Sequence, residues 1–127
     1  MRKPRYDLGV AQRARLFIGR SSLSRANETL QWDDLGAVER YVLELLQSLT
    51  PGDFAHVEAM PQRSGLPRYG DVYGKANREG VWFIKFELTT TTTTTLIMSC
   101  HEPERPLELA NGLTLRARRP PPRDDEP

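Results

Sequence analysis

Two histidines, His56 and His101, are the only ones in this chain, and they fall near the ends of two different predicted strands. Imidazole titrates nearest to neutral pH, so a pair of rings can divide the general-base and general-acid roles. Cleavage of RNA by its own 2′-hydroxyl needs that division, with a cation to stabilise the phosphorane-like transition state. Lys85, flanked on its strand face by Phe83 and Glu87, is the candidate cation. These residue types point to acid–base cleavage of an RNA backbone.

Aromatic and basic side chains near these positions can bind a single-stranded nucleic acid. Tyr69, Tyr73 and Phe83 can stack on unpaired bases. Arg63 and Arg68 flank a loop rich in Pro, Gly and Ser and can contact phosphates. Histidines in a chain of this size are more often structural than catalytic, so residue types alone leave a structural role open.

Other chemistries lack their sequence signatures. The chain has no Gly-rich phosphate loop, no Gly-x-Ser-x-Gly elbow and no His-Glu-x-x-His motif. Cys100 is the only cysteine, which excludes an internal disulfide and a zinc site built on several thiolates. We therefore expect no metal and no cofactor.

Length and composition are those of one ordinary globular domain. The chain has 127 residues, of which 38% are hydrophobic and 28% charged. The best apolar run, 81–88, is short and carries charges, and no signal-peptide apolar region follows the basic N-terminus, so we expect a cytoplasmic protein without membrane association. The net charge of +1 conceals a basic segment at 1–25 and an acidic one at 26–60. This polarity suits binding of a polyanion, although ordinary solvated surface also produces it.

The pattern of apolar and capping residues in the first third of the chain predicts helices. Apolar spacing favours a short helix from Leu8 to Phe17, and Ser22 can cap a second one that runs to about Leu30. Helical periodicity is strongest at 34–49, which we expect to be the main core helix. Pro51 and the following glycine end it.

The rest of the chain predicts strands. In 81–88, Trp82, Ile84, Phe86 and Leu88 should face the helices, whereas Lys85 and its neighbours should face solvent or a site. Asn111-Gly112 is the preferred centre of a two-residue hairpin turn. The threonine run at 89–95 favours extended backbone, either in a hairpin or in a loop. The predicted strands are 54–60, 71–73, 81–88 and 96–102, with a hairpin at 107–115.

Helices followed by consecutive strands predict an α+β domain in which N-terminal helices pack on a small antiparallel sheet. We expect a disordered basic arm at 1–6, a single domain at 7–118 with its core at 20–102, and a disordered Pro-rich tail at 119–127.

Four motifs in order carry a family resemblance. They are Asp53-Phe54-Ala55-His56, then Tyr69-Gly70-Asp71-Val72-Tyr73, then Gly80 through Phe83-Ile84-Lys85, and finally Leu96 through Cys100-His101-Glu102. Over roughly residues 20–102 the chain resembles the MqsR family of toxins, RelE-like messenger-RNA interferases. That family typically reads Asp-Phe-x-Lys, Trp-Gln-Asp-Val-Tyr, Tyr-Leu-Lys and Val-Ser-Phe-Lys-Glu at these places.

The resemblance implies a RelE/MqsR-like fold and a sequence-preferring endoribonuclease that cuts single-stranded messenger RNA without metal. It also implies a cognate antitoxin that carries a DNA-binding helix-turn-helix domain. Two family lysines associated with activity fall on His56 and His101, and histidine keeps a group that transfers protons. The family's glutamine and active-site tyrosine fall on Gly70 and Phe83, which lack their hydrogen-bonding groups.

These departures leave two other interpretations open. The first is a catalytically degenerate toxin fold that only binds an antitoxin or RNA, which the residues at Gly70 and Phe83 favour. The second is a DNA-binding regulator that uses the basic N-terminal arm. Cleavage of RNA in EDTA separates the proposed nuclease from both.

Overall fold

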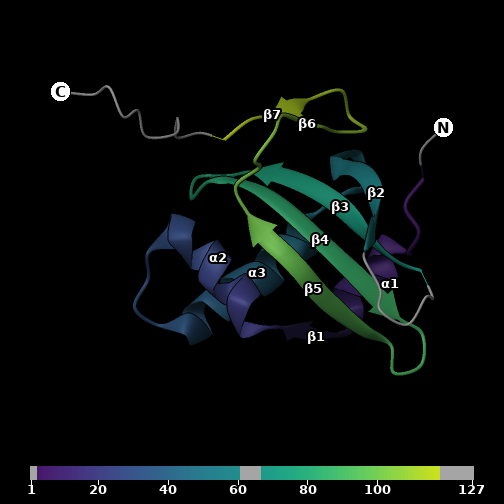
Figure 1. The fold of residues 1–127 in the computed structure, drawn as a ribbon, viewed down its shortest axis with the longest axis horizontal. Helices are drawn as coiled ribbons and strands as arrows, with labels where there is room; N and C mark the ends of the chain where they lie inside the picture. The colour runs from purple at the N-terminus through teal and green to yellow at the C-terminus, as the bar shows by residue number, and fades with distance from the viewer. Residues whose placement is uncertain (1–2, 61–66, 118–127) are drawn as a thin grey trace.

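The computed structural model describes residues 3–60 and 67–117, and in these ranges three α-helices accompany a five-stranded sheet (Figure 1). The expected α+β class is confirmed. The tail expected at 119–127 lies outside the described residues. In chain order the elements are α1 Leu8–Arg13, β1 Arg15–Ile18, α2 Arg20–Leu30, α3 Leu35–Ser48, a 3-10 turn Pro51–Asp53, β2 Phe54–Met60, β3 Arg68–Ala76, β4 Val81–Thr89, β5 Thr94–His101, β6 Leu107–Glu108 and β7 Thr114–Leu115.

The sheet is mixed, with strand order β1-β5-β4-β3-β2. The β1 strand runs parallel to β5, whereas the other neighbours are antiparallel. Our predictions of a purely antiparallel sheet and of a helix over Leu8–Phe17 are therefore wrong, because α1 ends at Arg13 and the next residues form β1. Ile18 is buried and pairs with Ile97, so strand pairing and burial outweigh the helical pattern of the isolated segment.

The helix α3 is the main core helix, as the sequence predicts. The Asp34 carboxylate caps its N-terminus by accepting a hydrogen bond from the Gly36 amide at 2.8 Å. The apolar face that α3 turns to the sheet is fully or almost fully buried, because its residues recur with the helical period. Its buried side chains are Val38, Val42, Leu45 and Leu46.

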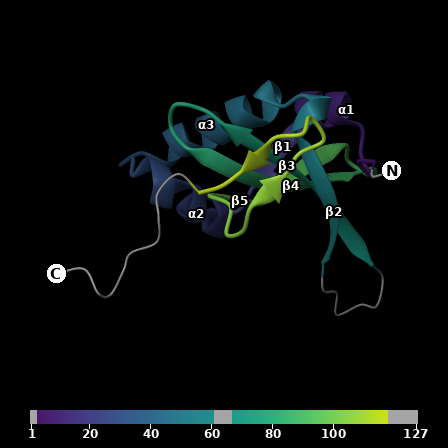
Figure 2. The same cartoon turned by 90° about the horizontal axis from the view of Figure 1, so that it is seen from above.

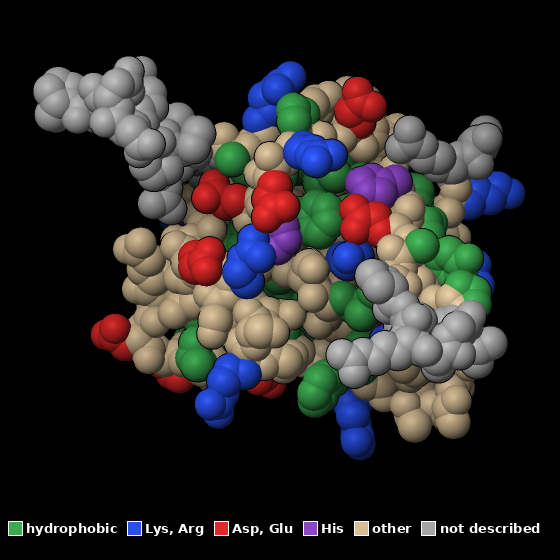
Figure 3. Space-filling view, viewed as in Figure 1, with side chains coloured by type: hydrophobic (Ala, Val, Ile, Leu, Met, Phe, Trp, Pro, Cys, Tyr) green, Lys and Arg blue, Asp and Glu red, His purple; other side chains and the backbone are tan. Residues whose placement is uncertain are grey.

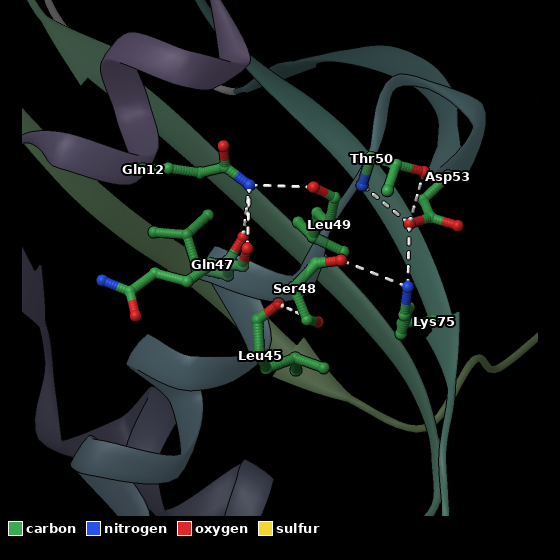
Figure 4. Close-up of polar contacts among 9 residues, drawn as sticks. Gln12, Leu45, Gln47, Ser48, Leu49, Thr50, Asp53 and Lys75 are labelled. Carbon is green, nitrogen blue, oxygen red and sulfur yellow. Dashed lines mark hydrogen bonds and ion pairs between the residues drawn. The ribbon is translucent and has the colours of Figure 1, made fainter.

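Side chains from two other elements satisfy the C-terminal end of α3 (Figure 4). The amide nitrogen of Gln12 donates to the carbonyl oxygens of Leu46 and Leu49 at 3.1 and 2.8 Å. The Lys75 ammonium on β3 donates to the Ser48 carbonyl at 3.2 Å and pairs with Asp53 at 3.3 Å. These bonds occupy carbonyls that a helix leaves without internal partners. They also fix the chain just before β2 begins.

The helix α2 is attached to β5 by a hydroxyl that we expected to cap it. Gly19, not Ser22, is the N-cap residue. The Ser22 hydroxyl is buried and donates to the Met98 carbonyl oxygen on β5 at 3.2 Å. The prediction of a helix ending near Leu30 is confirmed, but its predicted N-cap, Ser22, is three residues late.

The segment before α1 is held at the sheet by Asp71. The backbone amides of Arg5 and Tyr6 donate to its carboxylate at 2.8 and 2.9 Å, and the Tyr6 hydroxyl donates to the Tyr69 carbonyl. Burial raises the pKa of Asp71, and this effect exceeds the opposite effect of the two amide hydrogen bonds. The expected disorder of 1–6 does not hold for Arg5 and Tyr6, and the core extends outside 20–102 to Ala11.

The alternation predicted for β4 is confirmed from Trp82 to Phe86, but Leu88, predicted to face the helices, is only half-buried. Trp82, Ile84 and Phe86 are fully buried on the face that packs against the helices. Phe83 and Lys85 lie on the opposite face, which we call the open face of the sheet. The predicted strand 71–73 is the centre of the longer β3, which pairs with both β2 and β4. The first half of β3 and the end of β2 project from the body of the molecule (Figure 2).

The threonine run joins β4 to β5. Thr89 ends β4, Thr94 begins β5, and Thr93 in the turn has a φ of 50°. Thr95 is fully buried, and its hydroxyl donates to the Ala11 carbonyl at 2.8 Å. The run therefore supplies both the hairpin turn and a buried anchor for α1.

The predicted C-terminal hairpin is confirmed, and it packs on the open face. The prediction of a two-residue turn is wrong, because the Leu109 amide donates to the Leu113 carbonyl and leaves three residues between them. Gly112, the last of the three, has a φ of 91°. A side chain at Gly74 would place Cβ 2.7 Å from Leu107, so glycine permits this close approach. Leu107 and Leu109 pack with Val72 and form one wall above the open face.

Candidate active site

The open face carries a cavity of about 500 Å³ beside the C-terminal hairpin. His56, Lys85 and His101, the three residues predicted to be catalytic, all line it. They come from β2, β4 and β5, and Phe83 on β4 also lines the cavity. Figure 3 shows both histidines of the chain on one face, among acidic, basic and apolar side chains.

The strand register explains this meeting. His56 pairs with Val72, Val72 with Lys85, and Lys85 with Ser99, so one row crosses four strands. Paired residues on neighbouring strands point to the same side of a sheet. His101 lies two residues beyond Ser99 and pairs with Phe83. Residues that are 45 positions apart in the sequence, 56 and 101, therefore face one cavity.

Glu58 connects His56 to Lys85. Its Oε2 lies 2.8 Å from His56 Nε2, and its Oε1 lies 3.1 Å from the Lys85 ammonium. Partial burial raises the pKa of Glu58, but the hydrogen bonds and charges of His56 and Lys85 outweigh it and leave that pKa below its usual value. An ionised carboxylate only accepts hydrogen bonds, so His56 donates from Nε2. The carboxylate thus fixes the orientation of the His56 ring.

The stem of Lys85 crosses β3 over Gly70. A Cβ at Gly70 would lie 2.7 Å from Lys85 Cγ and 3.1 Å from Cδ, closer than real contacts allow. The Lys85 side chain is 17% exposed, so its ammonium reaches Glu58 along a largely covered path. Because Gly70 has no side chain, the stem of Lys85 can lie across β3 at this residue.

His101 is oriented by a backbone carbonyl and an aromatic ring. Its Nδ1 lies 2.6 Å from the Glu102 carbonyl oxygen, which can only accept, so Nδ1 carries the hydrogen. A neutral ring then has its lone pair on Nε2. The ring stacks on Phe83 with centroids 4.9 Å apart and an interplanar angle of 13°. This arrangement gives His101 a fixed plane and a proton-accepting nitrogen.

The cavity rim adds charges of both signs. Arg25 on α2 lies 3.4 Å from Glu104, and Arg105 also lines the cavity. The side chains of Arg25 and Glu104 are 45% and 75% exposed, so water screens this ion pair and an anionic ligand can replace Glu104. Apart from the histidines, the charged side chains that line the cavity are three cations and two carboxylates: Arg25, Lys85, Arg105, Glu58 and Glu104.

Of the predicted substrate-binding residues that the structure describes, Phe83 lines the cavity, whereas Arg68, Tyr69 and Tyr73 do not. The prediction that Tyr73 stacks on an unpaired base is corrected by its burial. Tyr73 is fully buried in the core on the helix side of the sheet, where it stacks on Phe86 and cannot contact RNA. Tyr69 carries the Arg5 guanidinium 4.3 Å above its ring. Arg68 is paired with Glu87, which raises the pKa of its guanidinium. Arg63 lies outside the described residues.

The structure adds residues that the sequence did not assign to the site. Glu58 had a detectable signal, since it lies two positions from His56 and so shares its strand face. Ser99 had the same signal, two positions from His101, whereas Arg25 had none, because only the packing of α2 on β5 brings it to the cavity. Among residues 3–60 and 67–117 no group of three or more His, Cys, Asp or Glu is arranged to hold a metal ion.

Comparisons with protein-family models, with curated proteins and with solved structures found no match to this chain. Within the described residues no helix is both long and apolar enough to cross a membrane.

Proposed function

We propose that this chain is a metal-independent endoribonuclease that cleaves single-stranded RNA by attack of the 2′-hydroxyl. The observation that carries the proposal is that the only two histidines of the sequence line one cavity together with Lys85. Two imidazoles and a cation are the groups that this transesterification needs. Phe83, stacked on His101, offers an aromatic surface beside them.

In the proposed reaction His101 is the base and His56 is the acid. His101 Nε2 removes the proton of the 2′-hydroxyl, and the 2′-oxygen forms a bond to phosphorus. The bond from phosphorus to the 5′-oxygen breaks, and His56, which is hydrogen-bonded to Glu58, acts as the acid that gives that oxygen a proton. The products are a 2′,3′-cyclic phosphate and a 5′-hydroxyl, so atoms and protons balance. Lys85 stabilises the negative charge of the transition state.

The strand order sets where the phosphate must lie. His56 on β2 and His101 on β5 are separated by β3 and β4, so about 14 Å, or three interstrand spacings, separates their backbones. Both rings rise from the same face, and Lys85 comes from β4 between them. A phosphodiester over β4 would thus have one histidine on each side.

The biological assignment is part of the same proposal. Four ordered motifs resemble the MqsR family, and an α+β fold with N-terminal helices agrees with a RelE-like architecture. We therefore propose a toxin of a toxin–antitoxin pair that acts on messenger RNA in the cytoplasm. Its partner would be an antitoxin with a DNA-binding domain.

The test is cleavage of an unstructured RNA in EDTA by the purified protein. We expect a bell-shaped pH dependence, a cyclic phosphate product, and no cutting where the scissile nucleotide is 2′-deoxy. His101→Gln and His56→Gln should each reduce the rate at least about a hundredfold, within the range of acid–base catalysis. Arg40→Ala, which changes an exposed cation on α3 away from the cavity, is the matched control. Full cutting by the double histidine variant would reject the assignment.

A binding module without catalysis is the second candidate. Its supporting observation is that Glu58 already neutralises Lys85 and occupies His56. Gly70 and Phe83 also lack the polar groups of the family pattern. Tight binding of RNA or of an antitoxin, with no cleavage of any RNA at any pH, would favour this candidate.

A further inference from the structure

A second cavity of about 330 Å³ adjoins the first one across β5. Arg25, Ser99 and His101 line both cavities, so the two form one continuous depression. Ser21, Ser22 and Met98 complete the second cavity, which lies where α2 packs on β5.

The wall of the second cavity is held in place by the contacts of α2. The Ser22 hydroxyl donates to the Met98 carbonyl and so ties the first turn of α2 to β5. Arg25 follows three residues later on the same helix face. Arg25 and His101 therefore both line the two cavities.

The two cavities differ in charge. Glu58 and Glu104 line the first cavity, whereas no acidic residue lines the second one among the described residues. The second cavity contains one guanidinium and the hydroxyls of Ser21 and Ser99. Guanidinium and hydroxyl groups are common partners of nucleic-acid phosphates and sugars.

We propose that the second cavity is a subsite for the sugar–phosphate of the nucleotide next to the cleaved one. This proposal rests on the proposed function, because it extends the same RNA past His101. Arg25, whose Nε also lies 3.6 Å from Glu28, would contact the phosphate between the two nucleotides after its Nη2 exchanges Glu104 for it. That exchange costs little, because the pair is solvent-exposed. The enzyme should therefore favour substrates longer than a dinucleotide.

The experiment compares a dinucleotide with two tetranucleotides. One tetranucleotide extends the dinucleotide at its 5′ end, and the other extends it at its 3′ end. Binding is measured by fluorescence anisotropy with 2′-O-methyl RNA, and cleavage by kcat/KM with the unmodified RNA. We expect the wild type to favour one of the longer RNAs by about tenfold, the range of a charge-assisted phosphate contact. Ser21→Asp places a carboxylate in the second cavity alone and should remove that gain.

Ser24→Asp is the matched control, because Ser24 is exposed on α2 and lines neither cavity. Both substitutions add the same charge near the N-terminal end of one helix. Equal affinity of the wild type for short and long RNA, or an unchanged gain in Ser21→Asp, would overturn the subsite. A length gain in binding without any cleavage would keep the subsite and reject the nuclease. Loss of the gain in both variants would show a general charge effect and also overturn it.

Discussion

Replacing Gly70 with alanine tests how the site is built without assuming its function. The glycine lies on β3 under the stem of Lys85, and the added methyl carbon would sit 2.7 Å from Lys85 Cγ. The Cγ atom is close to the backbone of β4, so it cannot move away as the end of a flexible side chain can. Lys85 must then change its rotamer and leave the Glu58 carboxylate.

The expected change in the free energy of unfolding follows from two opposing effects. Overpacking of this kind costs about 1–3 kcal/mol. Replacing glycine with alanine gains roughly 0.4–1 kcal/mol, because the unfolded chain loses freedom. Gly70→Ala should therefore destabilise the protein by about 1–2 kcal/mol.

A double-mutant cycle with Lys85→Ala identifies the cause. When the Lys85 stem is absent, the nearest remaining atom is the Phe86 carbonyl oxygen at 3.5 Å, which is an ordinary van der Waals distance. Gly70→Ala should then be neutral or slightly stabilising, and the coupling energy should be about 1–2 kcal/mol. Urea unfolding of the four proteins measures it. Equal destabilisation in both backgrounds would refute the clash, since the cost would then arise elsewhere.

Two further predictions concern Glu58 and Tyr73. Glu58→Gln should reduce stability at pH 7 by about 1 kcal/mol. Because the folded pKa of Glu58 is below 4.5, that contribution is present above pH 4.5 and is lost as the pH falls through the folded pKa. Urea unfolding at pH 7 and at about pH 3 should show the difference shrinking, and a difference independent of pH would contradict the ion-pair network. Tyr73→Phe should raise stability by up to about 1 kcal/mol, since its buried hydroxyl has no partner among the described residues. It should leave RNA cleavage unchanged, and a lower activity would restore Tyr73 as a substrate contact.

Two positions at which this sequence differs from the MqsR pattern it resembles are linked in this structure. A glutamine at position 70, as the MqsR pattern has it, would overlap the stem of Lys85 where that residue now lies. Phe83, where the pattern has tyrosine, instead stacks on His101. The glycine permits the Lys85–Glu58 contact, and the phenylalanine orients a histidine. We infer that these residues work as a set with His56 and His101.

Several elements could be predicted from the sequence because their signals are local. The helix α3 has a capping aspartate and an apolar period of 3.6, and β4 alternates with a period of two. The hairpin at Asn111-Gly112 depends on the left-handed backbone that Gly112 adopts. Each of these signals lies within a few residues of the element it specifies.

The tertiary structure alone decided the pairing of strands and the composition of the site. Arg15–Ile18 is a strand only because β5 offers a partner edge, and Tyr73 is buried because its face of β3 meets α3. The sequence indicated His56, Lys85 and His101 by type, but strand order and register placed them around one cavity. Strand pairing joins residues far apart in the chain, so the pattern around each residue cannot specify its neighbour across the sheet.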